Sequence, residues 1–320
     1  MSAQISQAFL LGAGLGTRLR PLTENLPKPL VPVANRPLLS WAMDHLRAEV
    51  GTRSFLVNTH HCPDAYGAAF PDGRYRDATI EFRHEPVLLD TGGGIDNIRD
   101  WLPRDESFLV YNGDILSDLP LAAAARQHRE RENAVTLVLR STGEEKRVGF
   151  DPETGRIVDL RGKLRPDWTD RYQFTGIYFV APAFLPYLAP GKIESVVLAF
   201  LRGIEDGAPI GGVVVDEGTW SDLGDPGSYL ASGDRLAEGT FPRYSTDVVI
   251  EKIHPAARIV PGARIDETSF VGAGSVIGAG ATVERSILWD DVEVDPGVAI
   301  RRSIIRSGIR VDCETEESIC

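Results

Sequence analysis

The chain has 320 residues, of which 42% are hydrophobic and 25% are charged, and its formal net charge is −12. This composition predicts a folded protein with one large domain and a smaller one, or with two domains of medium size, and it argues against disorder. The acidic balance argues against a uniformly basic surface for nucleic acid, although a few cations inside a cleft suffice to bind a small anion.

The cysteines and the N-terminal residues bear on the compartment. Cys62, Cys313 and Cys320 are odd in number and far apart, which does not describe a disulfide framework. The first residues have no basic start and only a short apolar run, so we expect no signal peptide. No apolar stretch approaches the ~20 residues of a membrane span. We therefore expect a cytoplasmic protein that binds neither membrane nor nucleic acid.

The first expected element is a strand at 7–11, which runs into a loop with Gly12, Gly14 and Gly16. Bare backbone brings N–H groups close to an anion, and ligands of such sheets bind at the carboxyl ends of strands. The spacing matches neither the dinucleotide-binding pattern nor the P-loop, because Thr17 stands where both need glycine.

Two cations follow this loop. Arg18 can offer a planar fork to phosphate oxygens, and Lys28 lies between two prolines that restrict its backbone. Fixed positive charge beside a glycine loop predicts a site for a polyphosphate.

Short apolar runs then alternate with helical patterns up to about residue 240. A helix is expected after Pro37, in its first turn, and Gly51 suits the end of that helix. Further strands are expected at 54–58, 79–85, 108–114, 134–140, 172–180 and 211–216, with a helix at 120–132 and a hairpin at 149–160. The alternation predicts an α/β fold with a Rossmann-like, mainly parallel sheet and helices on both faces.

A second glycine-rich stretch, LLDTGGGIDNI (88–98), contains Gly92 and Gly93. Such backbone can approach a nucleotide base or ribose closely, and it can equally mark the start of a helix. Both interpretations stay open.

From about residue 245 the apolar positions follow a period of six. They are Ile253, Ile259, Ile265, Val271, Ile277, Val283 and Trp289. Small residues crowd the intervening positions, which predicts a parallel β-helix whose coils each contain three hexapeptides. The register slips after Trp289, so we expect an irregular last coil, and residues 313–320 read as a polar tail.

The motifs together resemble one family. The stretch GAGLGTRLRPLTENLPKPLVPVANRPLL closely resembles the N-terminal signature of the sugar-1-phosphate nucleotidyltransferases, the NDP-sugar pyrophosphorylases. Over roughly residues 5–237, YNGD (111–114), IVDLRGK (157–163), FTGIYFV (174–180) and TWSDLGDPGSYL (219–230) support the likeness. The period-six segment resembles the left-handed β-helix of hexapeptide-repeat proteins, which is typical of many members. The TGGG loop is similar to those of N-acetylmuramate-1-phosphate uridylyltransferases and mannose-1-phosphate guanylyltransferases.

The resemblance implies a reaction and a set of site residues. A sugar 1-phosphate would attack the α-phosphorus of UTP or GTP, pyrophosphate would leave, and Mg²⁺ would be required. The implied catalytic residues are Arg18 and Lys28, and the implied metal ligands are Asp114 and Asp222. Nucleotide binding falls to Gly12, Ala13, Gly14, Gly16, Thr17, Gly92 and Gly93. Sugar-phosphate binding falls to Asn112, Lys163, Thr175 and Gly176. Asp118 and Asp225, by contrast, are expected in a turn or at a helix N-terminus.

We therefore expect a catalytic domain at 1–240, a β-helix at 245–312 that assembles a homo-oligomer, and a tail at 313–320. A non-catalytic regulatory or sensor subunit of the same fold is the alternative, and it would be expected to lose Arg18, Lys28 or an aspartate. An acyltransferase acting through the β-helix would need a catalytic histidine, and only His254 lies there. The base and the sugar stay open.

Overall fold

The computed structural model of the chain describes residues 4–244 and 250–320. It divides into two compact units: Met1–Gly14 with Ala42–Trp220, and Leu15–Trp41 with Ser221–Cys320. The second unit thus combines a segment that interrupts the first unit in sequence with the C-terminal part of the chain. The start expected for the second domain, at residue 245, lies outside the described residues.

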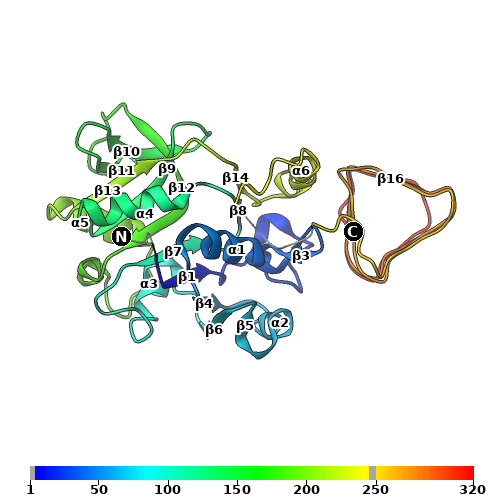
Figure 1. Cartoon of the computed structure of the whole chain (residues 1–320), viewed down its shortest axis with the longest axis horizontal. Helices are drawn as coiled ribbons and strands as arrows, with labels where there is room; N and C mark the ends of the chain where they lie inside the picture. Colours follow the sequence, from blue (N-terminus) through cyan, green and yellow to red (C-terminus); the bar gives the residue numbers. More distant parts are fainter. Residues whose placement is uncertain (1–3, 245–249) are drawn as a thin grey trace. The chain divides into compact units, whose positions relative to one another are not determined.

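The first unit is built around a mixed sheet. Its strands are β1 (Gln7–Leu11), β4 (Ser54–Thr59), β5 (Arg74–Tyr75), β6 (Ala78–His84), β7 (Phe108–Asn112), β9 (Val135–Arg140), β10 (Lys146–Asp151), β11 (Arg156–Leu160), β12 (Arg171–Val180) and β13 (Ile210–Val214). Within the described chain their order is β10-β11-β13-β9-β12-β7-β1-β4-β6-β5 (Figure 1). The short strand β8 (Ile115–Ser117) follows β7.

The expectation of parallel strands holds for part of this sheet. Strands β7, β1, β4 and β6 run parallel, and so do β9 and β13. Strand β12 instead runs antiparallel to both of its neighbours, β7 and β9. Strand β10 likewise pairs antiparallel with both β11 and β12, so this side of the sheet is mixed and not parallel.

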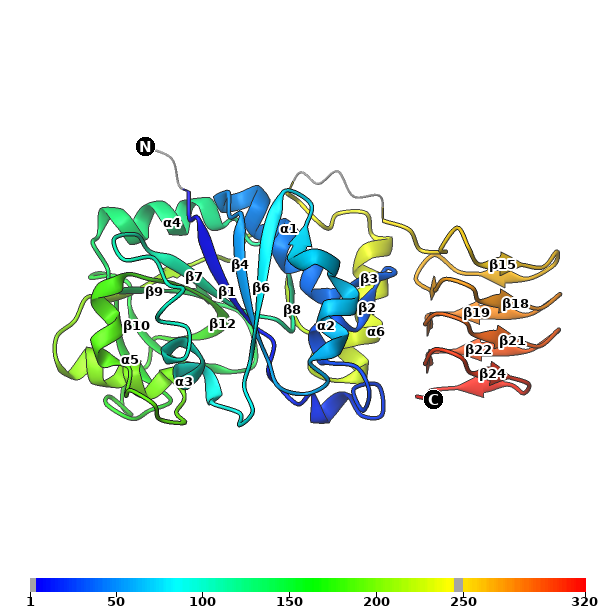
Figure 2. The same ribbon diagram turned by 90° about the horizontal axis from the view of Figure 1, so that it is seen from below.

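Helices cover both faces of the sheet. They are α1 (Leu38–Val50), α2 (Asp64–Ala69), α3 (Asp90–Asp96), α4 (Leu121–Glu130), α5 (Val196–Glu205) and the 3-10 helices η3 (Pro71–Gly73) and η4 (Pro182–Tyr187). Successive strand residues point to opposite faces. Phe9 and Val110 accordingly share a core with α3 and α5, while Tyr111 meets His45 of α1. Figure 2 shows α4 and α5 on opposite sides of the strands.

The helix expected after Pro37 is α1. Pro37 itself lies in the short strand β3 (Arg36–Pro37) and not in the first helical turn, so that detail of the prediction is wrong. Gly51 takes φ 71°, the left-handed conformation that commonly ends a helix, as expected.

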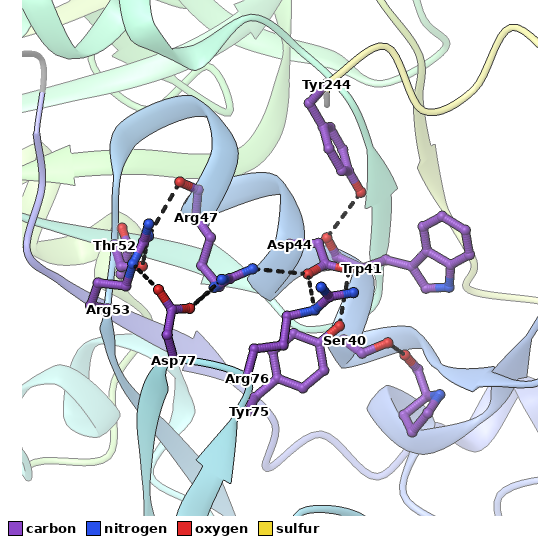
Figure 3. A network of polar contacts seen from close by, with 11 residues as sticks. Ser40, Trp41, Asp44, Arg47, Thr52, Arg53, Tyr75, Arg76, Asp77 and Tyr244 are labelled. Carbon is purple, nitrogen blue, oxygen red and sulfur yellow. Dashed lines mark hydrogen bonds and ion pairs between the residues drawn. The ribbon is translucent and has the colours of Figure 1, made fainter. Parts of the chain in front are cut away.

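A polar network ties α1 to the β5–β6 hairpin (Figure 3). The Asp44 carboxylate is almost fully buried, accepts a hydrogen bond from Tyr75 Oη at 2.9 Å and pairs with Arg76 at 3.1 Å. Arg47 joins Asp44 to Asp77, and the Arg47 hydrogen bond holds the pKa of Asp77 below its usual value. The network fixes the outer edge of the sheet to the helix that follows the glycine loop.

The second unit begins with short elements of the N-terminal segment. These are η1 (Thr17–Leu19), η2 (Lys28–Leu30), β2 (Pro32–Val33) and β3, and they are joined by the end of β14 (Trp220–Asp222) and by α6 (Pro226–Ala237). Asp225 caps α6, with reciprocal hydrogen bonds between it and Ser228, as its position before a helix predicts.

A parallel β-helix completes this unit. Its strands are β15 (Arg258–Ile259), β16 (Arg264–Ile265), β17 (Phe270–Val271), β18 (Val276–Ile277), β19 (Thr282–Glu284), β20 (Ile287–Leu288), β21 (Glu293–Val294), β22 (Ala299–Arg301), β23 (Ile304–Ile305), β24 (Arg310–Val311) and β25 (Thr315–Glu316). They stack as β15-β18-β21-β24, β16-β19-β22-β25 and β17-β20-β23, which Figure 2 shows edge-on.

The slip in period has a simple origin. Ile259 pairs with Ile277, three hexapeptides later, but Ile277 pairs with Val294, one residue short of that interval.

Buried serines mark one corner, where Ser269 Oγ accepts from the backbone N–H of Ser286, and Ser286 Oγ from that of Ser303. The tail predicted at 313–320 is wrong, because β25 pairs with β22 and Ile319 bridges to Ile304.

The β-helix contacts the other parts of its own unit. Tyr229 Oη of α6 donates to the carbonyl of Pro32 and accepts the indole N–H of Trp289 at 3.0 Å. Asn35 Nδ2 donates to the carbonyls of Glu251 at 2.9 Å and Val271 at 3.1 Å. These bonds attach the segment that carries Lys28 to the first coils.

None of the helices in the described ranges combines the length and the apolar character needed to cross a bilayer.

Candidate functional site

The glycine loop leaves the carboxyl end of β1, as predicted, and each glycine has its own reason. A Cβ on Gly12 would lie 2.6 Å from the carbonyl oxygen of Asn58, so only glycine fits. Gly14 is exposed and has open space around it. Gly16 takes φ 61°, which favours glycine, and its carbonyl accepts a hydrogen bond from Thr23 Oγ1 at 2.8 Å. Ala13 is buried, whereas Thr17 is exposed at the start of η1.

The two predicted cations meet a predicted metal ligand within the second unit. Lys28 Nζ lies 3.1 Å from Asp222 Oδ1, and its side chain is only 8% exposed. An Arg18 guanidinium nitrogen lies 3.6 Å from Asp222 Oδ2, with the arginine largely exposed. A Cβ on Gly224 would lie 2.6 Å from Arg18, so glycine there makes room for the guanidinium. One carboxylate therefore holds two cations in place, and both can exchange it for phosphate oxygens.

Other predicted residues gather in the first unit at the carboxyl ends of β1 and β7. Asn112 ends β7 and pairs with Leu11 of β1. Gly176 of β12 takes φ 75°, and a Cβ there would lie 2.6 Å from Asn112 Nδ2. The half-buried Asp114 follows two residues after Asn112. Burial raises the pKa of Tyr111, and the negative charges of Asp118 and Asp114 add to that rise.

Thr175 is fully buried and stabilises the backbone around the site. Its Oγ1 donates to the carbonyl of Val138 at 2.8 Å, and its own carbonyl accepts the indole N–H of Trp220 at the same distance. The side chain is thus engaged with backbone, and the prediction that it binds sugar phosphate stays a prediction.

Lys163 lies exposed in a turn that a buried carboxylate organises. Asp159 accepts backbone N–H groups of Gly162 at 2.7 Å and Leu164 at 2.7 Å, and it pairs with Arg171 at 2.9 Å. Burial alone would raise the pKa of Asp159, but these hydrogen bonds hold it below its usual value. The acidic residue is therefore part of the turn that presents Lys163.

Gly92 and Gly93 lie inside α3, and packing accounts for both. Their N–H groups donate to the carbonyl of Glu194 at 2.8 and 3.1 Å. A Cβ on Gly93 would lie 2.5 Å from the carbonyl of Lys192. The helix-start interpretation is thus realised, and a role in base binding stays a prediction.

The two aspartates expected to be structural are so. Asp118 is buried and accepts the Thr219 N–H, and Asp225 caps α6. His254 Nδ1 accepts the Ala256 N–H in a turn of the first coil. In the described ranges no three His, Cys, Asp or Glu side chains cluster as a metal site.

The structure brings the predicted residues together in two sets, one in each unit. Arg18, Lys28 and Asp222 form the set of the second unit, and Gly12, Asn112, Asp114 and Gly176 form that of the first. Sequence reasoning missed the supporting side chains. Asn58 and Tyr66 bond to Gly12 across long stretches of chain, and no local pattern signals such partners. Glu85 and Asp159 bond to Leu89 and Gly162 nearby in the chain, where an acidic residue before a turn is the available signal.

Family models match nearly the whole chain. The model described as "Nucleotidyl transferase" matches residues 7–239, and "GlmU-like, C-terminal hexapeptide" matches residues 245–317. A mannose-1-phosphate guanylyltransferase of Mycobacterium tuberculosis is 32% identical over 309 residues, which are 94% of this chain and 85% of the relative.

Two further relatives match a smaller share of this chain. A UTP--glucose-1-phosphate uridylyltransferase of Synechocystis is 27% identical over 70% of this chain and 61% of its own length. A mannose-1-phosphate guanyltransferase of Aspergillus fumigatus is 30% identical over 70% of this chain and 62% of its own.

Proposed function

The chain belongs to the nucleotidyl transferase family, and we propose that it transfers a nucleoside monophosphate from UTP or GTP to a sugar 1-phosphate. A phosphate oxygen of the sugar forms a bond to the α-phosphorus, the bond between that phosphorus and the α–β bridging oxygen breaks, and pyrophosphate leaves. The observation that carries the proposal is the triad of Lys28, Arg18 and Asp222. Two anionic reactants repel one another, so fixed cations are what this reaction needs.

Each cation has a role suited to its setting. Lys28 is nearly buried and paired with Asp222, and it would neutralise the α-phosphate as the new bond forms. Arg18 is exposed and can fork two oxygens, which suits the departing pyrophosphate. Lys163, on its organised turn, would neutralise the sugar phosphate, with Asn112, Thr175 and Gly176 at the sugar.

The residues fit a magnesium ion brought in by substrate. Mg²⁺ prefers one or two carboxylates, substrate phosphates and water to an all-protein cage. Asp222 keeps a partly exposed carboxylate whose present partners are cations that phosphate can take over, and Asp114 is half-buried beside Asn112. The ion would supply charge neutralisation to the phosphates, and Asp114 and Asp222 would hold it.

GTP and mannose 1-phosphate are the first pair to test. The relative matched over most of both chains is a mannose-1-phosphate guanylyltransferase, and the uridylyltransferase matches less of this chain. The chain also retains Arg18, Lys28, Asp114 and Asp222, which a non-catalytic regulatory subunit of this fold has no need to keep.

The test is a screen of UTP and GTP against mannose and glucose 1-phosphates, read by pyrophosphate release. We expect release with one pair that exceeds the others, and loss of it in Arg18→Ala. If folded protein releases no pyrophosphate with any pair of NTP and sugar 1-phosphate, the proposal fails and the alternative of a non-catalytic regulatory subunit gains support.

We also propose that the β-helix takes part in a homo-oligomer. Ile253 at its first coil is 40% exposed, and a solenoid whose terminal coil bares apolar residues is stabilised by a partner. Light scattering of the full chain at micromolar concentration tests this, and a monomer would contradict it.

A further inference from the structure

A buried polar chain runs between the two glycine-rich segments of the first unit. The Glu85 carboxylate, in a residue only 1% exposed, accepts Asn58 Nδ2 at 2.8 Å on one oxygen. Its other oxygen accepts the backbone N–H of Leu89 at 3.1 Å, just before α3. Glu85 is thus bonded at both ends to polar groups of separate segments.

Asn58 carries the chain on to the glycine loop. Its Oδ1 accepts the backbone N–H of Gly12 at 2.8 Å, and the residue is 3% exposed. A carboxylate only accepts, so Glu85 forces the amide nitrogen of Asn58 toward itself and the amide oxygen toward Gly12. Tyr66 Oη donates to the Gly12 carbonyl at 2.8 Å. Both polar groups of the first loop glycine are therefore held by side chains.

The third glycine of the TGGG stretch belongs to the same arrangement. A Cβ on Gly94 would lie 3.3 Å from both Asn58 Nδ2 and Glu85 Oε1, so a larger residue would crowd that hydrogen bond. Gly92 and Gly93 are explained by the neighbouring Lys192–Glu194 backbone, and Gly94 by this bond.

We propose that Asn58 and Glu85 are positioning residues that hold the Gly12 loop and the Leu89–Gly94 segment in one fixed relation for the nucleotide. The inference rests on the proposed function, because it assigns both segments to an NTP. We call Asn58, Glu85 and their hydrogen bonds to Gly12 and Leu89 the relay. A relay that only stabilised the fold would weaken the binding of both substrates equally, whereas the proposed relay weakens the binding of the NTP alone when it is broken.

In the relay the amide of Asn58 donates and the carboxylate of Glu85 accepts. Exchanging the amide and the carboxylate between the two positions therefore tests the relay sharply. Asn58→Asp alone sets two carboxylates against each other. Glu85→Gln alone can accept from Asn58 or from Leu89, but not from both, which leaves a buried donor unpaired. In the double variant the new carboxylate at position 58 still accepts from Gly12. The new amide at position 85 donates its N–H to that carboxylate, and its oxygen accepts from Leu89. All three hydrogen bonds return, with the same total charge.

The readouts are KM for each substrate by pyrophosphate release, and binding of UTP and GTP by calorimetry. We expect each single variant to raise KM and Kd for the nucleotide about tenfold, as loss of one buried hydrogen bond implies, and to leave KM for the sugar phosphate within about twofold. The double variant should return to within about threefold of wild type. Asn133→Asp is the matched control, since Asn133 is buried and bonded to Thr136 away from both segments, and it should leave nucleotide binding unchanged.

The relay is overturned if the double variant is no better than the worse single, or if both substrates shift equally. It is overturned as well if neither single variant changes nucleotide affinity. A wild-type protein that binds UTP or GTP without releasing pyrophosphate would refute the transferase proposal, and calorimetry on the three variants would still decide the relay.

Discussion

Tyr229→Phe removes one oxygen that joins three parts of the second unit. The hydroxyl donates to the carbonyl of Pro32 and accepts the indole N–H of Trp289 at 3.0 Å, and both Tyr229 and Trp289 are buried. Its loss leaves two groups without a partner, each worth about 1–2 kcal/mol, so we expect unfolding of this unit to become easier by about 2–4 kcal/mol. Because Pro32 follows Lys28 closely in the chain, we also expect turnover to fall several-fold.

The measurement is urea unfolding followed by tryptophan fluorescence, together with the rate of pyrophosphate release. Trp289→Phe removes only the donor and should cost less than Tyr229→Phe, since the bond to Pro32 survives. Tyr187→Phe is the control, because its hydroxyl bonds Asp206 at 3.2 Å on the exposed surface, and it should change stability by less than about 0.5 kcal/mol. Wild-type stability and turnover in Tyr229→Phe would show that the β-helix does not brace this segment.

Three further predictions follow from the site and the core. Arg18→Ala and Lys28→Ala should fold normally and lose most turnover, and near wild-type rates would remove that residue from the mechanism. Asp114→Asn and Asp222→Asn should raise the Mg²⁺ concentration needed for half-maximal rate, whereas full wild-type activity in excess chelator would exclude a metal held by these carboxylates. Burial lowers the pKa of His45 and of His128 to about 4, so as the pH falls the unfolded chain takes up protons at these residues before the folded chain does. The full contribution to the free energy of unfolding should be present above pH 6.5, and up to about 3 kcal/mol for each histidine should be lost toward pH 4. His45→Gln should make the free energy of unfolding, measured by urea titration, depend less on pH over this range.

The strands were predictable because a buried strand appears in the sequence as a short apolar run. The runs at 7–11, 54–58 and 134–140 became β1, β4 and β9 with shifts of a residue or less, since a short apolar run bounded by turn residues favours a buried strand. The period of six likewise survived as stacked coils, because each repeat must place one apolar residue inside.

Where the local signal was ambiguous or misleading, contacts with distant parts of the chain decided the outcome. The TGGG stretch forms helix α3 although glycine disfavours helices, because Lys192 and Glu194 pack where side chains would stand. The tail at 313–320 looked polar, yet its backbone completes the ladder of β22. Of the site, the charged residues could be named from motif spacing, while their supports, Asn58 and Glu85, are recognisable only once the sheet has brought β4 beside β1.

The divided origin of the second unit has a consequence for how the protein is made. Its first piece, with Arg18 and Lys28, leaves the ribosome early, but Asp222, Tyr229 and Val271, which contact that piece, are made only after more than half of the chain has intervened. Contacts this far apart in sequence form late, because the loop between them must close first. The early segment therefore waits without its native partners while the sheet of the first unit assembles. A chain that ends before residue 222 lacks the carboxylate that pairs with Arg18 and Lys28, so these two cations gain their partner only once most of the chain has been made.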